Sequence, residues 1–169
     1  MSFAIASAFS LEKSSARAVE ASVEELERGL GGRRPDLTVL FATAHHRDSL
    51  EEALALLDSR LRPVHQIGCA AQGIIANDRE LEREAALCLW GASLPGIDLR
   101  SGRIEAQETP EGLAFSGLPE VPESPATLLL FADPFDFPAV EFIQRLGEDH
   151  PRLQVLGGMA SGSMTPGEQ

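Results

Sequence analysis

The sequence predicts an α/β protein made of duplicated β-α-β units, with mixed sheets and an added antiparallel strand pair. Two continuously apolar runs, Leu37–Ala42 and Thr127–Ala132, are typical of strands covered on both faces. Each run leads into an amphipathic helical pattern and then a short apolar segment. The two stretches, residues 38–73 and 128–162, are similar to each other, which indicates an internal repeat.

The repeat extends through every element of the two stretches. Both run from an apolar strand through Phe-Ala and a loop to a helix, a proline, a short strand and the pattern Gly-x-x-Ala-x-Gly. Phe131 lies 90 residues after Phe41, whereas Gly157 lies 89 residues after Gly68, so one deletion relates the copies. The alternative to duplication is that the two stretches are similar only because many β-α-β units resemble one another. The shared glycine pattern favours duplication.

Apolar periodicity predicts the other elements of the first half. Phe3–Phe9 predicts a strand, and Ser14–Gly29 predicts a helix whose apolar residues recur at steps of four and three. Asp48 and Glu51 have the spacing of a capping box at the start of a second helix. A strand at Val64–Gly68 follows that helix.

The second half is expected to contain strands joined by proline-rich connections. Ala85–Trp90 and Ile97–Glu105 predict two strands linked by a Leu-Pro-Gly turn, and the alternating charges of Asp78–Glu84 before them predict a solvated segment. Residues 107–125 contain four prolines and predict a loop with one short strand at Leu113–Phe115.

A third helix is predicted to begin near Pro138, since proline suits the first helical turn. The last strand is expected at Leu153–Leu156. The helical residues predicted to face inward are Ala139, Phe142, Ile143 and Leu146.

The two copies of the repeat continue differently. The first glycine pattern is followed by the strand pair predicted within residues 84–105. The second pattern ends at Gly162 and is followed by seven residues, so the second copy lacks an equivalent strand pair. We therefore expect one domain over residues 1–169 that is an incomplete, N-terminal portion of a larger fold. Partner strands supplied from elsewhere are the alternative.

Composition excludes several classes of protein. The chain has 169 residues, with 14 basic and 26 acidic side chains and a net charge of -12. Proteins that bind nucleic acids or anionic membrane surfaces usually carry a basic patch, so neither partner is expected. No apolar run reaches the roughly 18 residues that span a bilayer. Cys69 and Cys88 alone make neither a disulfide framework nor a structural zinc site, and a cytoplasmic location is predicted.

The two glycine-rich patterns, residues 68–73 and 157–162, are candidate ligand sites. Small residues let a ligand approach the backbone, and successive N–H groups bind carboxylates or phosphates. Neither pattern has the Lys-Ser/Thr ending of a P-loop or the G-x-G-x-x-G spacing of a dinucleotide site. The alternative is that these glycines serve only tight turns and close packing.

Cys69 is a candidate nucleophile, with His45, His46 or His65 as its base. We favour a packed, inert Cys69, because cysteine is often buried as a small hydrophobe and the matching residue of the second copy is Gly158. Adjacent histidines on an extended chain point to opposite sides, so no metal site is predicted.

The loop after the second apolar strand, Asp133–Pro138, combines a carboxylate with two aromatic rings. Asp133 carries a charge able to pair with a ligand ammonium, and Phe135 and Phe137 are placed to wall a pocket. The alternative has Asp133 capping the helix and both rings buried.

Several motifs in a fixed order resemble the N-terminal region of the FIST family, named for F-box and intracellular signal transduction proteins. They are LTVLFATAHH, IGCAAQGII with the nearby DRELE, LWGASLPG, LLLFADPFDFP and VLGGMASG, and they extend from Leu37 to Gly162. The resemblance implies a sensory domain for a small ligand such as an amino acid, and a C-terminal FIST region beyond residue 169. It supplies no catalytic residue. The glycine-rich motifs of the family match at Gly68, Cys69, Ala71, Gln72, Gly73, Gly157, Gly158, Ala160, Ser161 and Gly162.

We therefore predict a non-enzymatic sensory domain that binds a small polar metabolite near the carboxyl ends of the repeated strands, between the two glycine-rich patterns. No cofactor is expected. A thiol-dependent enzyme using Cys69 and an interaction scaffold like the F-box members are the alternatives. The predicted ligand-binding residues are Gly68, Cys69, Gln72, Gly73, Asp133, Phe135, Gly157, Gly158, Ser161 and Gly162.

Overall fold

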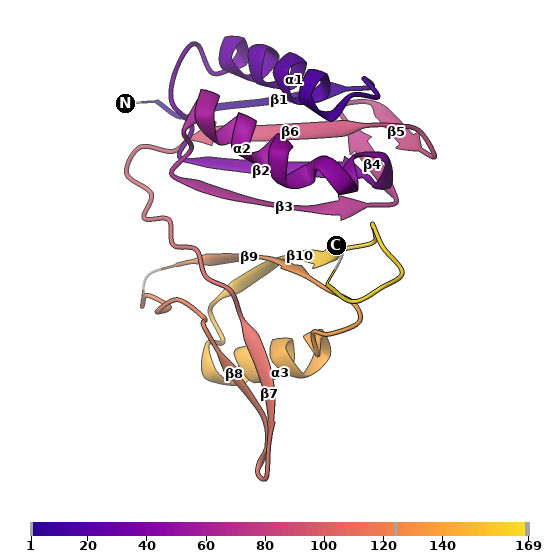
Figure 1. Ribbon diagram of the computed structural model, residues 1–169. Coiled ribbons are helices and arrows are strands. Elements are labelled where there is room, and N and C mark those ends of the chain that lie inside the picture. The colour runs from indigo at the N-terminus through magenta and orange to yellow at the C-terminus, as the bar shows by residue number, and fades with distance from the viewer. Residues whose placement is uncertain (1, 124, 168–169) are drawn as a thin grey trace. The chain divides into compact units, whose positions relative to one another are not determined.

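The computed structural model describes residues 2–123 and 125–167, which divide into two compact units (Figure 1). The first unit contains the described residues up to Leu99 together with Ser161–Met164. The second contains the described residues of Arg100–Ala160 together with Thr165–Gly167. The first unit contains a four-stranded sheet, a hairpin and the helices that precede Leu99, and the second contains two strand pairs and one helix.

A four-stranded mixed sheet with the order β1-β6-β2-β3 forms the centre of the first unit (Figure 1). β1 (Ala4–Ser10) and β2 (Leu37–Thr43) both pair antiparallel with β6 (Leu87–Ser93). β3 (His65–Ala71) pairs parallel with β2. The predicted fold class, an α/β protein with a mixed sheet and antiparallel pairs, is confirmed.

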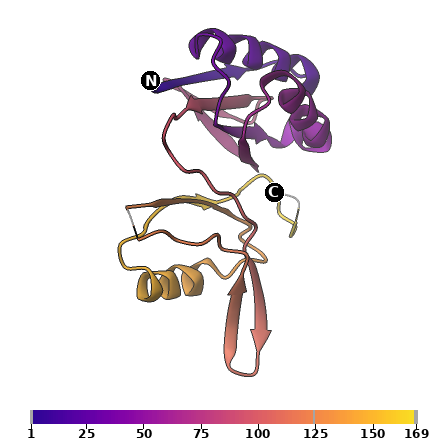
Figure 2. The same ribbon diagram turned by 90° about the vertical axis from the view of Figure 1, so that its left-hand side faces the viewer.

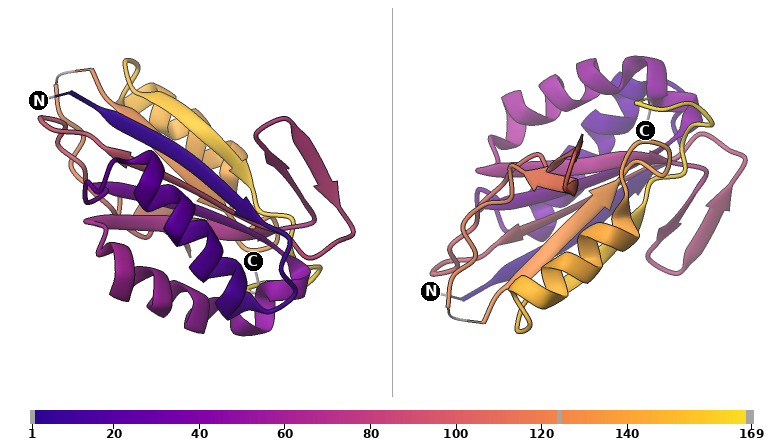
Figure 3. Two further views of the ribbon diagram at one scale, coloured as in Figure 1. Left: turned by 90° about the horizontal axis from the view of Figure 1, so that it is seen from above. Right: turned by 90° about the horizontal axis from the view of Figure 1, so that it is seen from below.

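Two helices, α1 (Ser15–Gly29) and α2 (Leu50–Leu61), lie side by side over one face of this sheet (Figure 3, left). The apolar stripe predicted for the first helix is buried, and burial of each such side chain contributes roughly 1.5–3 kcal/mol. Gly91 of β6 lies directly beneath Leu26, where a Cβ atom would meet the leucine side chain at 2.8 Å. The buried core residues on this face include Ala8, Val19, Val23, Leu26, Leu40, Leu57, Leu87 and Leu89.

β4 (Gly73–Ala76) and β5 (Arg79–Glu82) form a short antiparallel hairpin (Figure 1). Its buried apolar residues form a second cluster with Cys88. The charged segment predicted to be solvated therefore contains a strand. Leu81 within it is only 1% exposed. Alternate side chains of a strand face opposite sides, so one apolar residue among charges is enough to anchor the strand.

The start of α2 differs from the prediction. Ala44–Ser49 forms a 3-10 helix, η1, and Ser49 precedes α2 without a side-chain capping hydrogen bond, so the capping box at Asp48 and Glu51 is wrong. The ring of His46 is buried within η1, and Asp48 instead lies 3.8 Å from the guanidinium of Arg47.

The strand predicted at Val64–Gly68 extends further, to Ala71. The glycine that marks the end of the predicted strand lies inside β3. A Cβ atom on Gly68 would overlap the carbonyl group of Leu40, so glycine permits close approach of β2 and β3 here rather than a turn.

In the second unit, β9 (Thr127–Ala132) and β10 (Gln154–Met159) form a parallel pair joined by α3 (Ala139–Asp149). A hairpin made of β7 (Glu105–Thr109) and β8 (Gly112–Ser116) extends away from this pair (Figure 2).

Two predictions for the region before β9 are wrong. No strand covers Ile97–Glu105, since the backbone is irregular up to residue 104 and β7 begins at Glu105. The early part of the loop predicted at residues 107–125 belongs to the β7–β8 hairpin, although the short strand at Leu113–Phe115 is confirmed within β8. The prolines of this region lie outside the two strands, which is why the hairpin forms before most of them.

Fewer residues of α3 are buried than the sequence predicts. Phe142 and Leu146 are buried, whereas Ile143 is 47% exposed, so its predicted inward position is wrong. An aromatic cluster gathers on the buried side: the rings of Phe115 and Phe137 lie 5.1 and 5.3 Å from that of Phe142. This cluster ties the hairpin to the helix.

The two β-α-β stretches share the same strand register. Gly68 lies opposite Leu40 in the first unit, and Gly157 lies opposite Leu130 in the second. In both cases a Cβ atom on the glycine would overlap the carbonyl of the opposite leucine. The first glycine of each pattern therefore has the same structural role, and duplication remains a prediction that this likeness supports.

Candidate functional site

The carboxyl ends of β2 and β3 lie next to each other, because the strands are parallel and Thr43 pairs with Ala71. His45 follows β2 within η1, and Gln72 follows β3, so both belong to this edge of the sheet. Ligands of open α/β sheets commonly bind outside the carboxyl ends of parallel strands. We call residues 43–46, 72–73 and 161–162 the β2–β3 edge.

The second glycine-rich pattern contributes to the β2–β3 edge, since Ser161–Met164 belongs to the first unit. The Gln72 backbone N–H donates to the Ser161 hydroxyl oxygen at 3.1 Å. Gly162 lies so close to Ala70 that a Cβ atom would overlap it. Gln72 and Ser161 are 89 residues apart, so equivalent positions of the two patterns are in direct contact.

The histidines of η1 have different environments. His46 is fully buried, its Nδ1 lies 2.9 Å from the Ser15 hydroxyl oxygen, and burial together with neighbouring His45 lowers the pKa of His46. Within the described residues its Nε2 has no hydrogen-bond partner. His45 is exposed, and its Nδ1 lies 3.5 Å from the Thr43 hydroxyl, which also receives the Ala86 N–H at 3.0 Å.

Cys69 lies inside β3 in one row with Phe41 and Cys88 across the sheet. Desolvation by burial raises the pKa of both thiols, which favours the protonated form over the nucleophilic thiolate. One strand separates the two cysteines, which places them roughly 10 Å apart and beyond the reach of a disulfide. Both are free thiols.

Four of the predicted ligand-binding residues belong to the second unit. Asp133 accepts hydrogen bonds from the backbone N–H groups of Phe135 at 2.8 Å and Gly167 at 2.6 Å, and these bonds lower the pKa of its carboxyl group. The carboxylate thus stabilises the turn after β9. Phe135 is 47% exposed. Gly157 has a φ of +143°, and Gly158 has open space around it.

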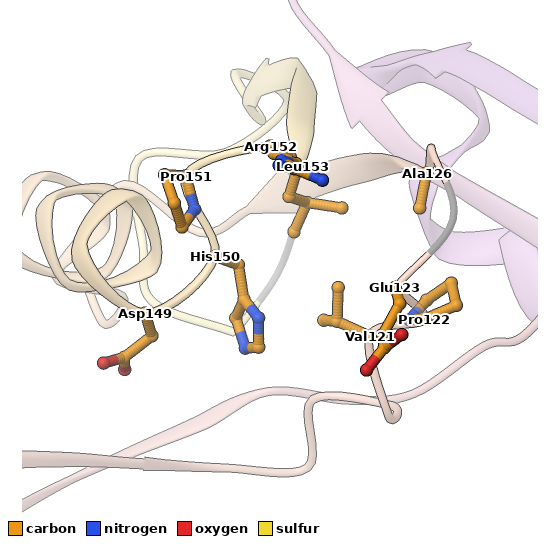
Figure 4. Close-up of a pocket in the computed structure, with 9 residues that line it drawn as sticks. All are labelled: Val121, Pro122, Glu123, Ala126, Asp149, His150, Pro151, Arg152 and Leu153. Carbon is orange, nitrogen blue, oxygen red and sulfur yellow. The ribbon is translucent and has the colours of Figure 1, made fainter.

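A separate pocket of about 380 Å³ lies in the second unit, between residues 121–123 and Ala126 on one side and the turn that follows α3 on the other (Figure 4). Val121 and Leu153 give it apolar walls, and His150 and Arg152 supply polar groups. None of the residues predicted from the sequence lines it, and no pattern in the sequence pointed to it.

The described part of the chain holds neither a metal-binding group nor a membrane-spanning helix. No group of three or more His, Cys, Asp or Glu side chains is placed to share a metal ion in residues 2–123 and 125–167. In the same residues, none of the helices combines the length and apolar character that crossing a bilayer requires.

Sequence reasoning missed two features of the β2–β3 edge. The Ser15–His46 contact joins residues that are 31 positions apart and belong to different elements, so no local spacing signals it. The contact between Gln72 and Ser161 had a signal, since both occupy the same position of the repeated glycine pattern.

Comparisons with known proteins agree with the resemblance seen in the sequence. The FIST N domain model matches residues 36–169. Uncharacterized protein Rv0628c of Mycobacterium tuberculosis is 34% identical over 151 residues, which cover 89% of this chain and 39% of that protein. Uncharacterized protein Mb0898c of Mycobacterium bovis is 30% identical over 151 residues, which cover 89% of this chain and 38% of that protein.

The chain spans about two fifths of the length of these curated relatives. No solved structure matches it. The family model covers most of the chain, including both β-α-β stretches and both glycine-rich patterns. On this evidence the chain belongs to the FIST family, as a FIST N domain.

Proposed function

We propose that this FIST N domain is a non-enzymatic sensory domain that binds a small polar metabolite, such as an amino acid, at the β2–β3 edge. The observation that carries the proposal is the contact between Gln72 and Ser161. It brings equivalent positions of the two glycine-rich patterns to the carboxyl ends of two parallel strands.

The chemistry of the edge suits a zwitterion. The Ser161 hydroxyl and the exposed side chains of Gln72 and His45 offer donors for a carboxylate and acceptors for an ammonium group. Gly73 lies against β5, where a Cβ atom would meet the Glu82 side chain at 3.1 Å, so its lack of a side chain serves the packing of the β4–β5 hairpin. A zwitterion has no net charge, so the net charge of -12 on the chain does not oppose its binding.

Two observations support a binding role over thiol catalysis. The raised pKa of Cys69 works against a thiolate, and the Nδ1 atoms of His45 and His46 lie against Thr43 and Ser15. The roles predicted for Asp133, Phe135, Gly157 and Gly158, and the cytoplasmic location, remain predictions from the sequence.

Thermal unfolding with added metabolites tests the proposal. We expect at least one of the twenty amino acids to raise the unfolding midpoint by roughly 5–10 °C at 100 times its dissociation constant, because ligand binding then adds about 2.7 kcal/mol to the folded state. Ser161→Ala should weaken binding about tenfold, since a lost hydrogen bond costs roughly 1–1.5 kcal/mol.

Ser59→Ala is the matched control, because the Ser59 hydroxyl donates to the Leu56 carbonyl on α2, away from the β2–β3 edge. It should bind the same amino acid as tightly as the unmodified chain. The absence of any midpoint shift across the amino acids would contradict the proposal, as would equal weakening by the two variants.

A further inference from the structure

At Leu129 the outer side of β9, the side away from β10, has no strand beside it within the described residues. Backbone N–H groups of Gln154 and Ala160 donate to the carbonyls of Ala126 and Ala132, at 3.2 and 2.8 Å. Alternate residues of a strand bond to the same neighbour, so the backbone groups of Leu129 point away from β10. Among the described residues no hydrogen bond reaches those outward groups of Leu129.

Such an edge is unusual for a parallel pair. Parallel strands normally lie within larger sheets that are covered on both faces, and an isolated pair of strands has little stability of its own. The segment Thr127–Ala132 carries no charged residue, no proline and no bulge, the features that normally protect an exposed edge. Leu129 and Leu156 are paired on one face and are 36% and 60% exposed.

The first unit shows what occupies the equivalent edge. β2 is the counterpart of β9, and Val39 lies 90 residues before Leu129, the offset that also relates Phe41 to Phe131. In the first unit Val39 pairs with Trp90 of the antiparallel strand β6. The second unit has no strand at this position within its described residues.

The exposed flank of α3 provides an independent observation. The buried residues Phe142 and Leu146 lie 89 residues after Ala53 and Leu57 of α2, so the two helices face their sheets in the same way. α2 is covered on its flank by α1, and Leu54 packs against that core.

Ile143, the counterpart of Leu54 at the same offset, is 47% exposed, and neighbouring Val140 is 66% exposed. Two apolar residues one helical turn apart therefore lie open where the first unit has a helix. The strand edge and the helix flank are open together, as expected if one layer of structure belongs beside both.

We propose that the outer edge of β9 takes one antiparallel strand, the counterpart of β6. We infer that this strand comes from the region that the longer FIST relatives carry outside the part matched here. More than half of the length of Rv0628c lies outside the match, which is ample for a strand and a helix.

Amide hydrogen exchange on two unmodified proteins tests the proposal: this chain and full-length Rv0628c. The Leu129 amide should exchange rapidly in this chain, whereas the aligned amide of Rv0628c should exchange at least about a hundredfold more slowly, because there it is bonded to the added strand. The Leu130 amide is the internal control, since it faces β10 and should be protected in both proteins. Equal exchange of the Leu129 position in the two proteins would overturn the proposal.

A proline variant gives a second readout. Leu129→Pro removes the outward N–H together with a partly buried leucine side chain, and it leaves the N–H groups that bond to β10 in place. The side-chain loss acts in both proteins, so proline at the aligned position should lower the thermal midpoint of Rv0628c by about 5 °C more than Leu129→Pro lowers that of this chain. Leu130→Pro should destabilise both proteins.

The oligomeric state tests the source of the added strand. In size-exclusion chromatography this chain should elute as a monomer of 18.1 kDa. A dimer that Leu129→Pro dissociates would instead place a second copy at the edge and overturn the proposed source.

Discussion

Gly157→Ala should destabilise the second unit by about 2–4 kcal/mol, and Gly68→Ala should have a comparable effect on the first. A methyl group at either position would overlap the carbonyl of the opposite strand, Leu130 or Leu40. Gly157 also has a φ of +143°, a conformation that residues with a Cβ atom rarely adopt. The strands must separate to accept the methyl group, which breaks the parallel ladder.

Gly158→Ala is the matched control, because Gly158 has no neighbouring atom within 4 Å of an added Cβ atom and no positive φ. Urea unfolding followed by fluorescence of Trp90, the single tryptophan, reports on the first unit. Amide exchange in α3 reports on the second. A Gly157→Ala protein as stable as Gly158→Ala would show that the close approach of β9 and β10 is not required.

His46→Gln should remove a pH dependence of stability as well as about 1–3 kcal/mol of stability at pH 7.5. The ring of His46 is fully buried against Ser15, and burial lowers its pKa in the folded chain. The unfolded chain therefore binds a proton near pH 6.5 that the folded chain does not. Stability is then complete above pH 6.5 and declines as the pH falls below it.

The size of the pH dependence follows from the single proton that His46 binds in the unfolded chain. At pH 5.5 the unmodified chain should lose up to about 1.4 kcal/mol relative to pH 7.5 from His46 alone, and His46→Gln should lack this part of the decline. Urea unfolding at both pH values measures the difference. His45→Gln is the control: it should retain most of the pH dependence, because the larger cause of the lowered pKa is burial. Identical pH profiles for His46→Gln and the unmodified chain would contradict the assignment.

Local chemistry in the sequence was sufficient for the elements of the repeat. The runs that became β2 and β9 are continuously apolar, and the helical spacing of Val19, Val23 and Leu26 marks the buried face of α1. These patterns are strong because every turn of such a helix, and every residue of such a strand, places an apolar side chain in the core. The family resemblance depended on the same stretches and on the glycine patterns between them.

Errors arose where one contact outweighed the local pattern. The capping box at Asp48 did not form in a turn where the ring of His46 is buried. The charged segment that contains Leu81 forms a strand, because the Leu81 side chain is buried in the apolar cluster that contains Cys88. Ile143 was expected to be buried from its spacing alone, but the neighbour that its counterpart Leu54 has in the first unit is absent from the described second unit.

By itself, the sequence determined the fold class and the family of this protein and predicted the repeat, because apolar periodicity and glycine spacing are properties of the chain read in order. Only the tertiary structure decided that Gln72 meets Ser161, that His46 meets Ser15, and that the outward edge of Leu129 has no strand beside it in the described chain. Each of these depends on residues distant in the chain and on which backbone groups the sheet leaves unbonded. Hydrogen bonds and van der Waals contacts act over a few ångströms in space, whatever the separation along the sequence.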